Sequence, residues 1–216
     1  MVLRREPVVI IGAGGHAKVI IDIIKTQNSY DIVGCLDEAP GNGREVAGVK
    51  IIGADVMLPK LRKNGIDKIF VAIGDNKKRA ELAKQAQNLG FRLINAISPY
   101  AYIADTVELH DGLAVMPGAV VNAGSRIMDN AIVNTKASVD HDCVVGSCCH
   151  VGPGCTLAGN VRLGEGVFLG AGTAVIPGVS VGSWSVTGAG AAIVADIPAN
   201  ALAVGVPGKV IKMLSR

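Results

Sequence analysis

An aliphatic side chain returns at every sixth position from Ile103 to Ile193, and no insertion breaks the register. Fifteen of the sixteen repeating positions hold Ile, Leu or Val, and the exception is Thr187. A strict period of six fits neither an α-helix, which repeats about every 3.6 residues, nor an isolated strand, which repeats about every two. It fits a three-sided coil in which each six-residue unit forms one short strand and turns one corner. The repeat therefore predicts a parallel β-helix whose repeating side chains point inward and stack.

The composition is consistent with such a coil and argues against two kinds of partner. Glycine supplies 28 of the 216 residues, and tight corners need its freedom to adopt a positive φ. A net charge of +3 without a basic block argues against nucleic acid. No apolar run approaches the length of a membrane span, and Met1 to Pro7 lacks the apolar core of a signal peptide. We therefore expect no nucleic acid and no membrane among the partners.

Three of the five cysteines, Cys143, Cys149 and Cys155, occupy the same slot of successive repeats, where a small apolar side chain is required. A buried thiol meets that requirement. The spacing matches no Cys-x-x-Cys metal motif, and neighbouring inward slots explain the group better than disulfides do. Reduced thiols predict a cytoplasmic location.

The chain before the repeats alternates between two kinds of pattern. Buried-strand patterns occupy residues 8–11, 32–36, 51–52, 69–73 and 91–94. Helical patterns between them occupy residues 19–24, 55–63 and 76–88. This alternation predicts a parallel sheet covered by helices. We expect two domains: a Rossmann-like α/β domain over residues 1–98, and the β-helix with a C-terminal tail over residues 99–216.

A glycine-rich turn, Gly12-Ala13-Gly14-Gly15-His16, follows the first predicted strand. It matches only part of the Gly-x-Gly-x-x-Gly dinucleotide fingerprint, but bare backbone N–H groups at a helix start attract phosphate. Asp37 ends the second strand, where a carboxylate can accept a hydrogen bond from a ribose or a base, and Gly74 ends another strand at the same edge. The alternative is a set of ordinary turns, with His16 and Lys18 on the surface.

His141 stands between Asp140 and Asp142 near a predicted corner of the coil. A carboxylate that is hydrogen-bonded to one ring nitrogen leaves the other nitrogen to act as a base. Adjacent side chains on a strand point opposite ways, so only a bend lets either acid reach the ring, and the spacing does not decide which acid does so. The alternative is a solvated polar corner. His150 follows half a coil later and can line the same cleft or cover a turn.

Five segments occur in an order that resembles a known family. They are GAGGHAK near the start, LDE after the second strand, AIGDN, NTKASVDHDCVVGSCCHVGPG, and VGVPGKVIK near the end. Together they resemble the bacterial sugar O/N-acetyltransferases, which join an N-terminal nucleotide-sugar domain to a left-handed β-helix. The resemblance is closest to the N-acetyltransferases of nucleotide-linked 4-amino-4,6-dideoxy sugars, such as GDP-perosamine or a UDP-linked bacillosamine precursor. It implies that acetyl-CoA is the acetyl donor.

The resemblance also assigns roles by position. His141 matches the family's general base, and Asp142 matches the acidic neighbour that raises its basicity. His150 matches a histidine that contacts acetyl-CoA. The other cofactor positions are Ala171 and Ala189, beside the pantetheine arm, and Gly205 and Lys209, near the adenine end. The nucleotide-sugar positions are Gly14, Gly15, His16, Asp37, Glu38, Ile73 and Gly74.

Two positions depart from the family's pattern. Relatives commonly carry Glu after the base, and Asp142 is shorter by a methylene group, which puts its hydrogen bond to the ring in doubt. Relatives also often have His-Pro-Ser where this chain has Ser98-Pro99-Tyr100, a segment that we assign to the linker.

The expected reaction is direct acetyl transfer to the C4 amine with His141 as the base, in a homotrimer formed by packing of flat coil faces. Three alternatives stay open: O-acetylation of sialic acid or another sugar hydroxyl, a zinc-dependent hydratase, and a non-catalytic sugar-nucleotide sensor. Zinc would need His141, His150 and a third ligand, from His110, His16 or an acid, and we expect no metal. The sequence does not distinguish UDP from GDP.

Overall fold

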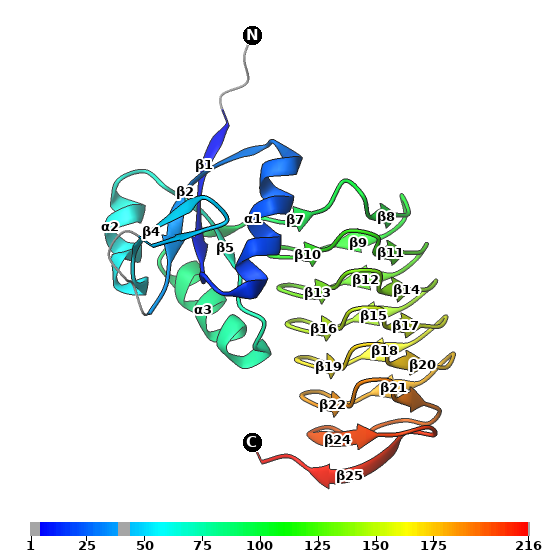
Figure 1. Ribbon diagram of the computed structural model, residues 1–216. Coiled ribbons are helices and arrows are strands. Elements are labelled where there is room, and N and C mark those ends of the chain that lie inside the picture. Colours follow the sequence, from blue (N-terminus) through cyan, green and yellow to red (C-terminus); the bar gives the residue numbers. More distant parts are fainter. Residues whose placement is uncertain (1–4, 39–43, 216) are drawn as a thin grey trace. The chain divides into compact units, whose positions relative to one another are not determined.

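The chain divides into two compact units, Met1–Ser98 and Pro99–Arg216, in a computed structural model that describes residues 5–38 and 44–215 (Figure 1). The first unit contains a six-stranded sheet in the order β3-β4-β2-β1-β5-β6. Its strands are β1 (Glu6–Ile11), β2 (Tyr30–Leu36), β3 (Glu45–Val46), β4 (Val49–Gly53), β5 (Lys68–Val71) and β6 (Arg92–Leu93). Neighbouring strands are parallel except for β3, which pairs antiparallel with β4. A two-residue strand, β7 (Ala96–Ile97), follows.

Helices pack against this sheet as the alternating pattern predicts. They are α1 (Gly15–Gln27), α2 (Leu58–Lys63) and α3 (Asn76–Asn88), with a short 3-10 turn, η1 (Asp55–Met57), before α2. The central strand β1 is buried from Val8 to Ile11, which explains its unbroken apolar run. Leu61 of α2 and Leu82 of α3 share one apolar cluster with Val9 of β1. The Rossmann-like α/β assignment is therefore confirmed.

The sequence did not indicate the hairpin between β3 and β4. Its two-residue turn consists of Ala47 and Gly48, which both have positive φ values, 47° and 72°. Turns of this kind are usually marked by Asn-Gly or Asp-Gly, because those residues adopt a positive φ at low cost. Alanine at the first position hides the signal.

Three parallel sheets form the faces of the second unit. The first face contains β10 (Ala114–Val115), β13 (Ile132–Val133), β16 (His150–Val151), β19 (Phe168–Leu169), β22 (Val186–Thr187) and β24 (Ala201–Val204). The second contains β8 (Tyr102–Ile103), β11 (Val120–Val121), β14 (Ser138–Val139), β17 (Thr156–Leu157), β20 (Ala174–Val175) and β23 (Ala192–Ile193). The third contains β9 (Glu108–Leu109), β12 (Arg126–Ile127), β15 (Val144–Val145), β18 (Arg162–Leu163) and β21 (Ser180–Val181).

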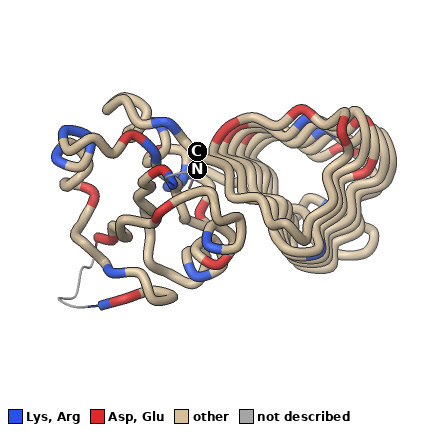
Figure 2. Tube along the Cα trace, turned by 90° about the horizontal axis from the view of Figure 1, so that it is seen from above, with Lys and Arg blue, Asp and Glu red and all other residues tan. Residues whose placement is uncertain are grey.

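Each strand of the coil pairs with the strand one full turn further along the chain. Val121 pairs with Val139, and Val139 pairs with Leu157, so three hexads make one turn. Seen from above, the turns superpose on a three-sided outline (Figure 2). The repeating side chains point inward, and Val121, Val139 and Leu157 have no exposed surface. The predicted hexapeptide coil is confirmed as a left-handed parallel β-helix.

The exception in the aliphatic series has a local explanation. The Thr187 hydroxyl lies 2.8 Å from the Thr173 hydroxyl and accepts a hydrogen bond of 3.1 Å from the backbone N–H of Gly170. Both threonines are buried, so each hydroxyl needs such a partner. The cysteine slot is also filled as predicted, with buried thiols and no disulfide among the described residues.

Two edges of the coil carry the predicted catalytic residues and the predicted cofactor residues Ala171 and Ala189. We call the corner between the first and second faces the first edge; it contains residues 134–136, 152–154, 170–172 and 188–190. The corner between the second and third faces is the second edge; it contains residues 122–124, 140–142, 158–160, 176–178 and 194–196. The last turn ends in an antiparallel hairpin of β24 with β25 (Lys209–Met213). In the described ranges, no helix is long and apolar enough to cross a membrane.

Candidate active site

His141 lies on the second edge, and Asp142 is the acid that reaches its ring. The His141 Nδ1 atom is 2.8 Å from the Asp142 Oδ2 atom. Asp142 adopts a left-handed backbone conformation with a φ of 59°, which supplies the bend that strand geometry lacks. The shorter Asp side chain is therefore long enough for this hydrogen bond. The His141 side chain is 56% exposed, so a substrate can reach it from solvent.

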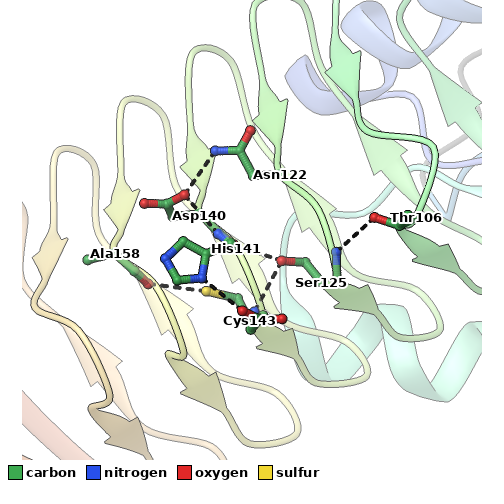
Figure 3. Close-up of polar contacts among 9 residues, drawn as sticks. Thr106, Asn122, Ser125, Asp140, His141, Cys143 and Ala158 are labelled. Carbon is green, nitrogen blue, oxygen red and sulfur yellow. Dashed lines mark hydrogen bonds and ion pairs between the residues drawn. The ribbon is translucent and has the colours of Figure 1, made fainter.

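Asp140 has a different role from Asp142. Its Oδ1 atom accepts a hydrogen bond of 2.8 Å from the backbone N–H of His141 and one of 3.0 Å from the side-chain amide of Asn122 (Figure 3). These hydrogen bonds lower the pKa of Asp140 below its usual value, and the one from the His141 N–H has the larger effect. Asp140 thus stays ionised and holds the main chain of His141 rather than its ring.

The hydrogen bond to Asp142 sets the electronic state of the imidazole. An ionised carboxylate only accepts, so Nδ1 carries the proton and Nε2 is the basic nitrogen. This hydrogen bond is the main cause of a raised pKa of His141, and the negative charges of Asp140 and Asp142 add to it. The arrangement can take a proton from an approaching nucleophile and stabilise the resulting imidazolium.

Gly159, one turn further along the second edge, provides the space for the imidazole. A Cβ atom at Gly159 would overlap the Nε2 and Cε1 atoms of His141. The same slot of other turns holds Ala123, Pro177 and Ala195, so the coil itself does not require glycine there. The missing side chain is explained by the ring of His141.

His150 lies on the first face rather than beside His141. It is 8% exposed in β16, its Nε2 atom is 2.8 Å from the side-chain nitrogen of Asn134, and its ring meets Phe168 edge-on at 5.2 Å. Asn134 begins the first edge of the preceding turn. Within one subunit, the structure therefore places His141 on the second edge and His150 on the first face, so the two rings lie on different sides of the coil.

The other predicted cofactor residues follow His150 along the first edge. Ala171 and Ala189 occupy equivalent exposed corners of successive turns, joined by a hydrogen bond of 2.8 Å from the Gly190 N–H to the Ala171 carbonyl. Gly205 lies in the next turn with a φ of 95°, and its carbonyl accepts from the Ala192 N–H at 3.0 Å. Lys209 begins the exposed strand β25. Ala171 and Ala189 thus stack on successive turns of the first edge, and Gly205 and Lys209 follow at the end of the coil.

The predicted nucleotide-sugar residues meet at the carboxyl ends of strands in the first unit. Gly14 is the N-cap of α1, and Gly15 and His16 are its first residues. A Cβ atom at Gly14, Gly15 or Gly74 would meet no atom within 4 Å, so this surface is open. The Asp37 Oδ2 atom accepts a hydrogen bond of 3.0 Å from the Ala13 N–H, which ties the end of β2 to the glycine turn.

Glu38 and Ile73 take part in contacts that bring in residues the sequence reasoning missed. The Glu38 carboxylate forms an ion pair of 2.7 Å with Lys78 of α3. The Ile73 carbonyl accepts a hydrogen bond of 3.0 Å from Arg79, a buried side chain in α3. Arg79 had no signal of its own, because a helical arginine is usually solvated.

Asp55 is a second missed residue near the nucleotide-sugar positions. Its Oδ1 atom is buried and has no hydrogen-bond partner among the described residues. Burial is the main cause of a raised pKa of Asp55, and the charge of Glu38 adds to it. Asp55 follows β4 as Asp37 follows β2, so the rule that singled out Asp37 at a strand end could have found it.

Metal binding has no structural support in the described ranges. They contain no group of three His, Cys, Asp or Glu side chains that could hold a metal ion. His110 is instead occupied by carboxylates, with Nε2 3.0 Å from Glu108 and Nδ1 3.6 Å from Asp129.

Comparison with known proteins finds a matching domain family and matching solved structures of sugar acetyltransferases. The PglD N-terminal domain family matches residues 7–86. The structure of PerB from Caulobacter crescentus, in complex with CoA and GDP-perosamine, is 46% identical, with 98% of this chain and 100% of that chain covered and a TM-score of 0.92. The acetyltransferase domain of PglB from Neisseria gonorrhoeae, in complex with acetyl coenzyme A, is 36% identical, with 96% and 100% covered and a TM-score of 0.89.

The chain belongs to the acetyl-CoA-dependent N-acetyltransferases of nucleotide-linked amino sugars. The Caulobacter perosamine N-acetyltransferase has also been solved with its own His141 replaced by Asn, again with CoA and GDP-perosamine; it is 46% identical, with a TM-score of 0.93 and 98% of this chain and 100% of that chain covered. A curated protein, "Uncharacterized protein L142" of Acanthamoeba polyphaga mimivirus, is 34% identical over 105 residues, 49% of this chain. The transferase chain spans only 20% of that relative's length.

Proposed function

We propose that the protein transfers the acetyl group of acetyl-CoA to the C4 amine of a nucleotide-linked 4-amino-4,6-dideoxyhexose, either GDP-perosamine or a UDP-linked 4-amino sugar. The observation that carries this proposal is the hydrogen bond of 2.8 Å between His141 and Asp142 on an exposed corner. It occurs in a chain that is 46% identical to a protein solved with CoA and GDP-perosamine.

The proposed reaction is a direct transfer. The sugar amine attacks the thioester carbonyl and forms the C–N bond, while Nε2 of His141 takes a proton from the nitrogen. The C–S bond then breaks, and the departing CoA sulfur receives a proton from the imidazolium, which restores the base. Asp142 keeps Nδ1 protonated and stabilises the imidazolium. A backbone N–H at a coil corner stabilises the negative charge on the carbonyl oxygen.

An acetyl-enzyme intermediate is not part of this proposal. All five cysteines are buried, and burial raises the pKa of the Cys143 and Cys155 thiols, which disfavours the nucleophilic thiolate. We therefore expect sequential rather than ping-pong kinetics. Reduced thiols also fit the cytoplasm, where we place the reaction.

The first unit binds the nucleotide in this proposal. The N–H groups at the start of α1 attract the diphosphate, since Gly14 and Gly15 leave the backbone uncovered. Asp37 and Glu38, at the end of β2, accept hydrogen bonds from the ribose or the base. Ile73 and Gly74, after β5, line the same edge of the sheet.

The assay that tests the function measures CoA thiol release from acetyl-CoA with GDP- and UDP-linked 4-amino-4,6-dideoxy sugars, and with sialic acid in parallel. Rapid release with one nucleotide amine supports the proposal and identifies the nucleotide. Release with sialic acid alone would replace it with O-acetylation. Absence of release with every acceptor contradicts a transferase activity on these sugars.

The pH profile gives a second test, because the base acts as neutral imidazole and activity falls as pH drops through its pKa. The Asp142 hydrogen bond raises the pKa of His141, so Asp142→Asn should lower this pKa. The acidic limb of kcat/KM should then move to lower pH, and the plateau should fall because the ring is less well oriented. The Asp129→Asn variant, altered at another corner, should leave the limb in place; an unmoved limb in Asp142→Asn would contradict the pairing.

We further propose a homotrimer whose sites are shared between subunits. His141 lies on the second edge, whereas His150, Ala171 and Ala189 line the first edge or face, so a site that needs both sets draws them from two copies. Flat coil faces pack most simply with cyclic symmetry. A monomer in light scattering would contradict the proposal.

Mixed trimers test the sharing directly. We expect His141→Asn and Ala171→Glu homotrimers to be nearly inactive, the second because a longer, charged side chain on the exposed first edge obstructs the pantetheine arm of CoA. Coexpression of the two should restore about a quarter of wild-type activity, because a site with an intact base from one subunit and an intact edge from the next forms in about one case in four. No recovery would place both sets in one subunit.

A further inference from the structure

The corner that carries His141 is tied to the preceding turn at both of its ends. At the start, the Asn122 amide donates to the Asp140 Oδ1 atom at 3.0 Å. Ser125, which is buried, donates to the Asp140 carbonyl at 2.7 Å and accepts from the Cys143 N–H at 3.1 Å. Figure 3 shows Asn122 and Ser125 reaching this corner from the preceding turn. The four residues from 140 to 143 are thus held between two side chains of one neighbouring turn.

The polar link between Asn122 and Asp140 is not a requirement of the coil. The same slot of the later turns holds Ala158, Ile176 and Val194, and Ile176 and Val194 are exposed. Apolar side chains therefore suffice at this slot in the turns beyond the one that carries His141. The polar pair occurs in the turn that carries the base and in the turn before it.

We infer that Asn122 and Asp140 are positioning residues for the proposed base: Asn122 orients the Asp140 carboxylate, which receives the His141 N–H and fixes the main chain from which the imidazole projects. This inference rests on the proposed function. Asp142 sets the rotation of the imidazole about its side-chain bonds, and Asp140 fixes the position of the His141 backbone. A base needs both, because a displacement of about 1 Å can cost about a hundredfold in rate.

The hydrogen-bond geometry and the charge of Asp140 can be separated by substitution. In Asp140→Asn, the side-chain oxygen can still accept from the His141 N–H and from Asn122, but the negative charge is lost. In Asp140→Ala, both are lost. Among the described residues, the charged groups that act on the ring are the carboxylates of Asp140 and Asp142, and the turn beyond contributes Gly159. Loss of the Asp140 charge should therefore move the His141 titration to lower pH.

The experiment compares Asn122→Ala, Asp140→Ala and Asp140→Asn by kcat, by KM for both substrates, and by melting temperature. The control is Asp196→Ala, on the same edge, where the carboxylate accepts a 2.8 Å hydrogen bond from the Ser180 N–H three turns beyond Asp142. We expect both alanine variants to lose about tenfold or more in kcat with KM nearly unchanged. Asp140→Asn and Asp196→Ala should keep kcat within about twofold on the pH plateau.

An NMR titration of the His141 imidazole gives a readout that needs no substrate. Asp140→Asn and Asp140→Ala should move the His141 titration to lower pH, and Asp196→Ala should not. If the wild-type protein transfers no acetyl group, the proposed function fails, and the titration still tests whether Asp140 acts on His141. Four outcomes would each overturn the inference. Asp140→Ala could keep the wild-type kcat, or lose no more than Asp140→Asn does. Asp196→Ala could lose as much kcat as Asp140→Ala, or the His141 titration could stay in place.

Discussion

Replacement of His141 by Asn should lower kcat by at least about a hundredfold, while the melting temperature changes little. General-base catalysis typically contributes about 10²–10⁴ in rate, so a hundredfold loss corresponds to about 2.7 kcal/mol in the barrier. The asparagine side chain is polar, of similar width, and has no basic nitrogen. The position is an exposed corner, so the inward stack of the coil is untouched. The measurement is kcat by thiol release beside a thermal melt.

His110→Asn is the matched control for this variant. His110 also lies in the coil and also contacts two carboxylates, those of Glu108 and Asp129, and its side chain is 30% exposed. We expect its kcat to remain at the wild-type value. Unchanged turnover in His141→Asn would remove His141 from the mechanism, and an equal loss in both variants would point to a general effect on the coil.

The second large effect is expected at Gly159, which touches no substrate in the proposed mechanism. In Gly159→Ala, the added methyl group overlaps the Nε2 edge of His141, so the ring must leave its position against the coil. A displacement of about 1 Å at a reacting atom can cost about a hundredfold, and we expect kcat to fall by that order. The pH profile should change as well, since the hydrogen bond to Asp142 is disturbed.

Two comparisons isolate the collision at Gly159. Ala195→Val enlarges the side chain in the same slot two turns further along, and we expect it to keep wild-type kcat. In the His141→Asn background, the smaller side chain removes most of the overlap, so the fall in melting temperature caused by Gly159→Ala should shrink. Neighbouring residues couple in this way, and additive losses would show that the methyl group meets something other than the ring.

Much of the fold could be predicted because both units use simple periodicities. The six-residue series starting at Ile103 specifies the strand, the corner and the inward slot of every turn, and the pairing of Val121 with Val139 follows from three hexads per turn. The alternation before residue 98 similarly predicts a parallel sheet covered by helices, although not the order of its strands. The β3–β4 hairpin was missed because its turn begins with Ala47, which carries no turn signal.

The site was less predictable, because its contacts join residues from different turns. His141 could be singled out by the acids on either side, but the φ of 59° at Asp142 decides that this acid, and not Asp140, reaches the ring. Asn122 and Gly159 lie 18 residues from Asp140 and His141, respectively, and neither is unusual on its own in a chain of coil corners. Their relation to His141 is visible only when the turns are stacked.

By itself, the sequence determined the architecture and the inward side chains, since both depend on residue type at a regular spacing. It led to His141 as the proposed base through its resemblance to the acetyltransferase family. The tertiary structure decided which faces and edges carry His141 and His150, and which side chains contact the proposed base. The physical reason is that inward packing depends on a local pattern repeated in every turn. The surroundings of His141 depend instead on contacts between turns. The separation of 18 residues places two corners next to each other, but it does not determine which of their side chains form contacts.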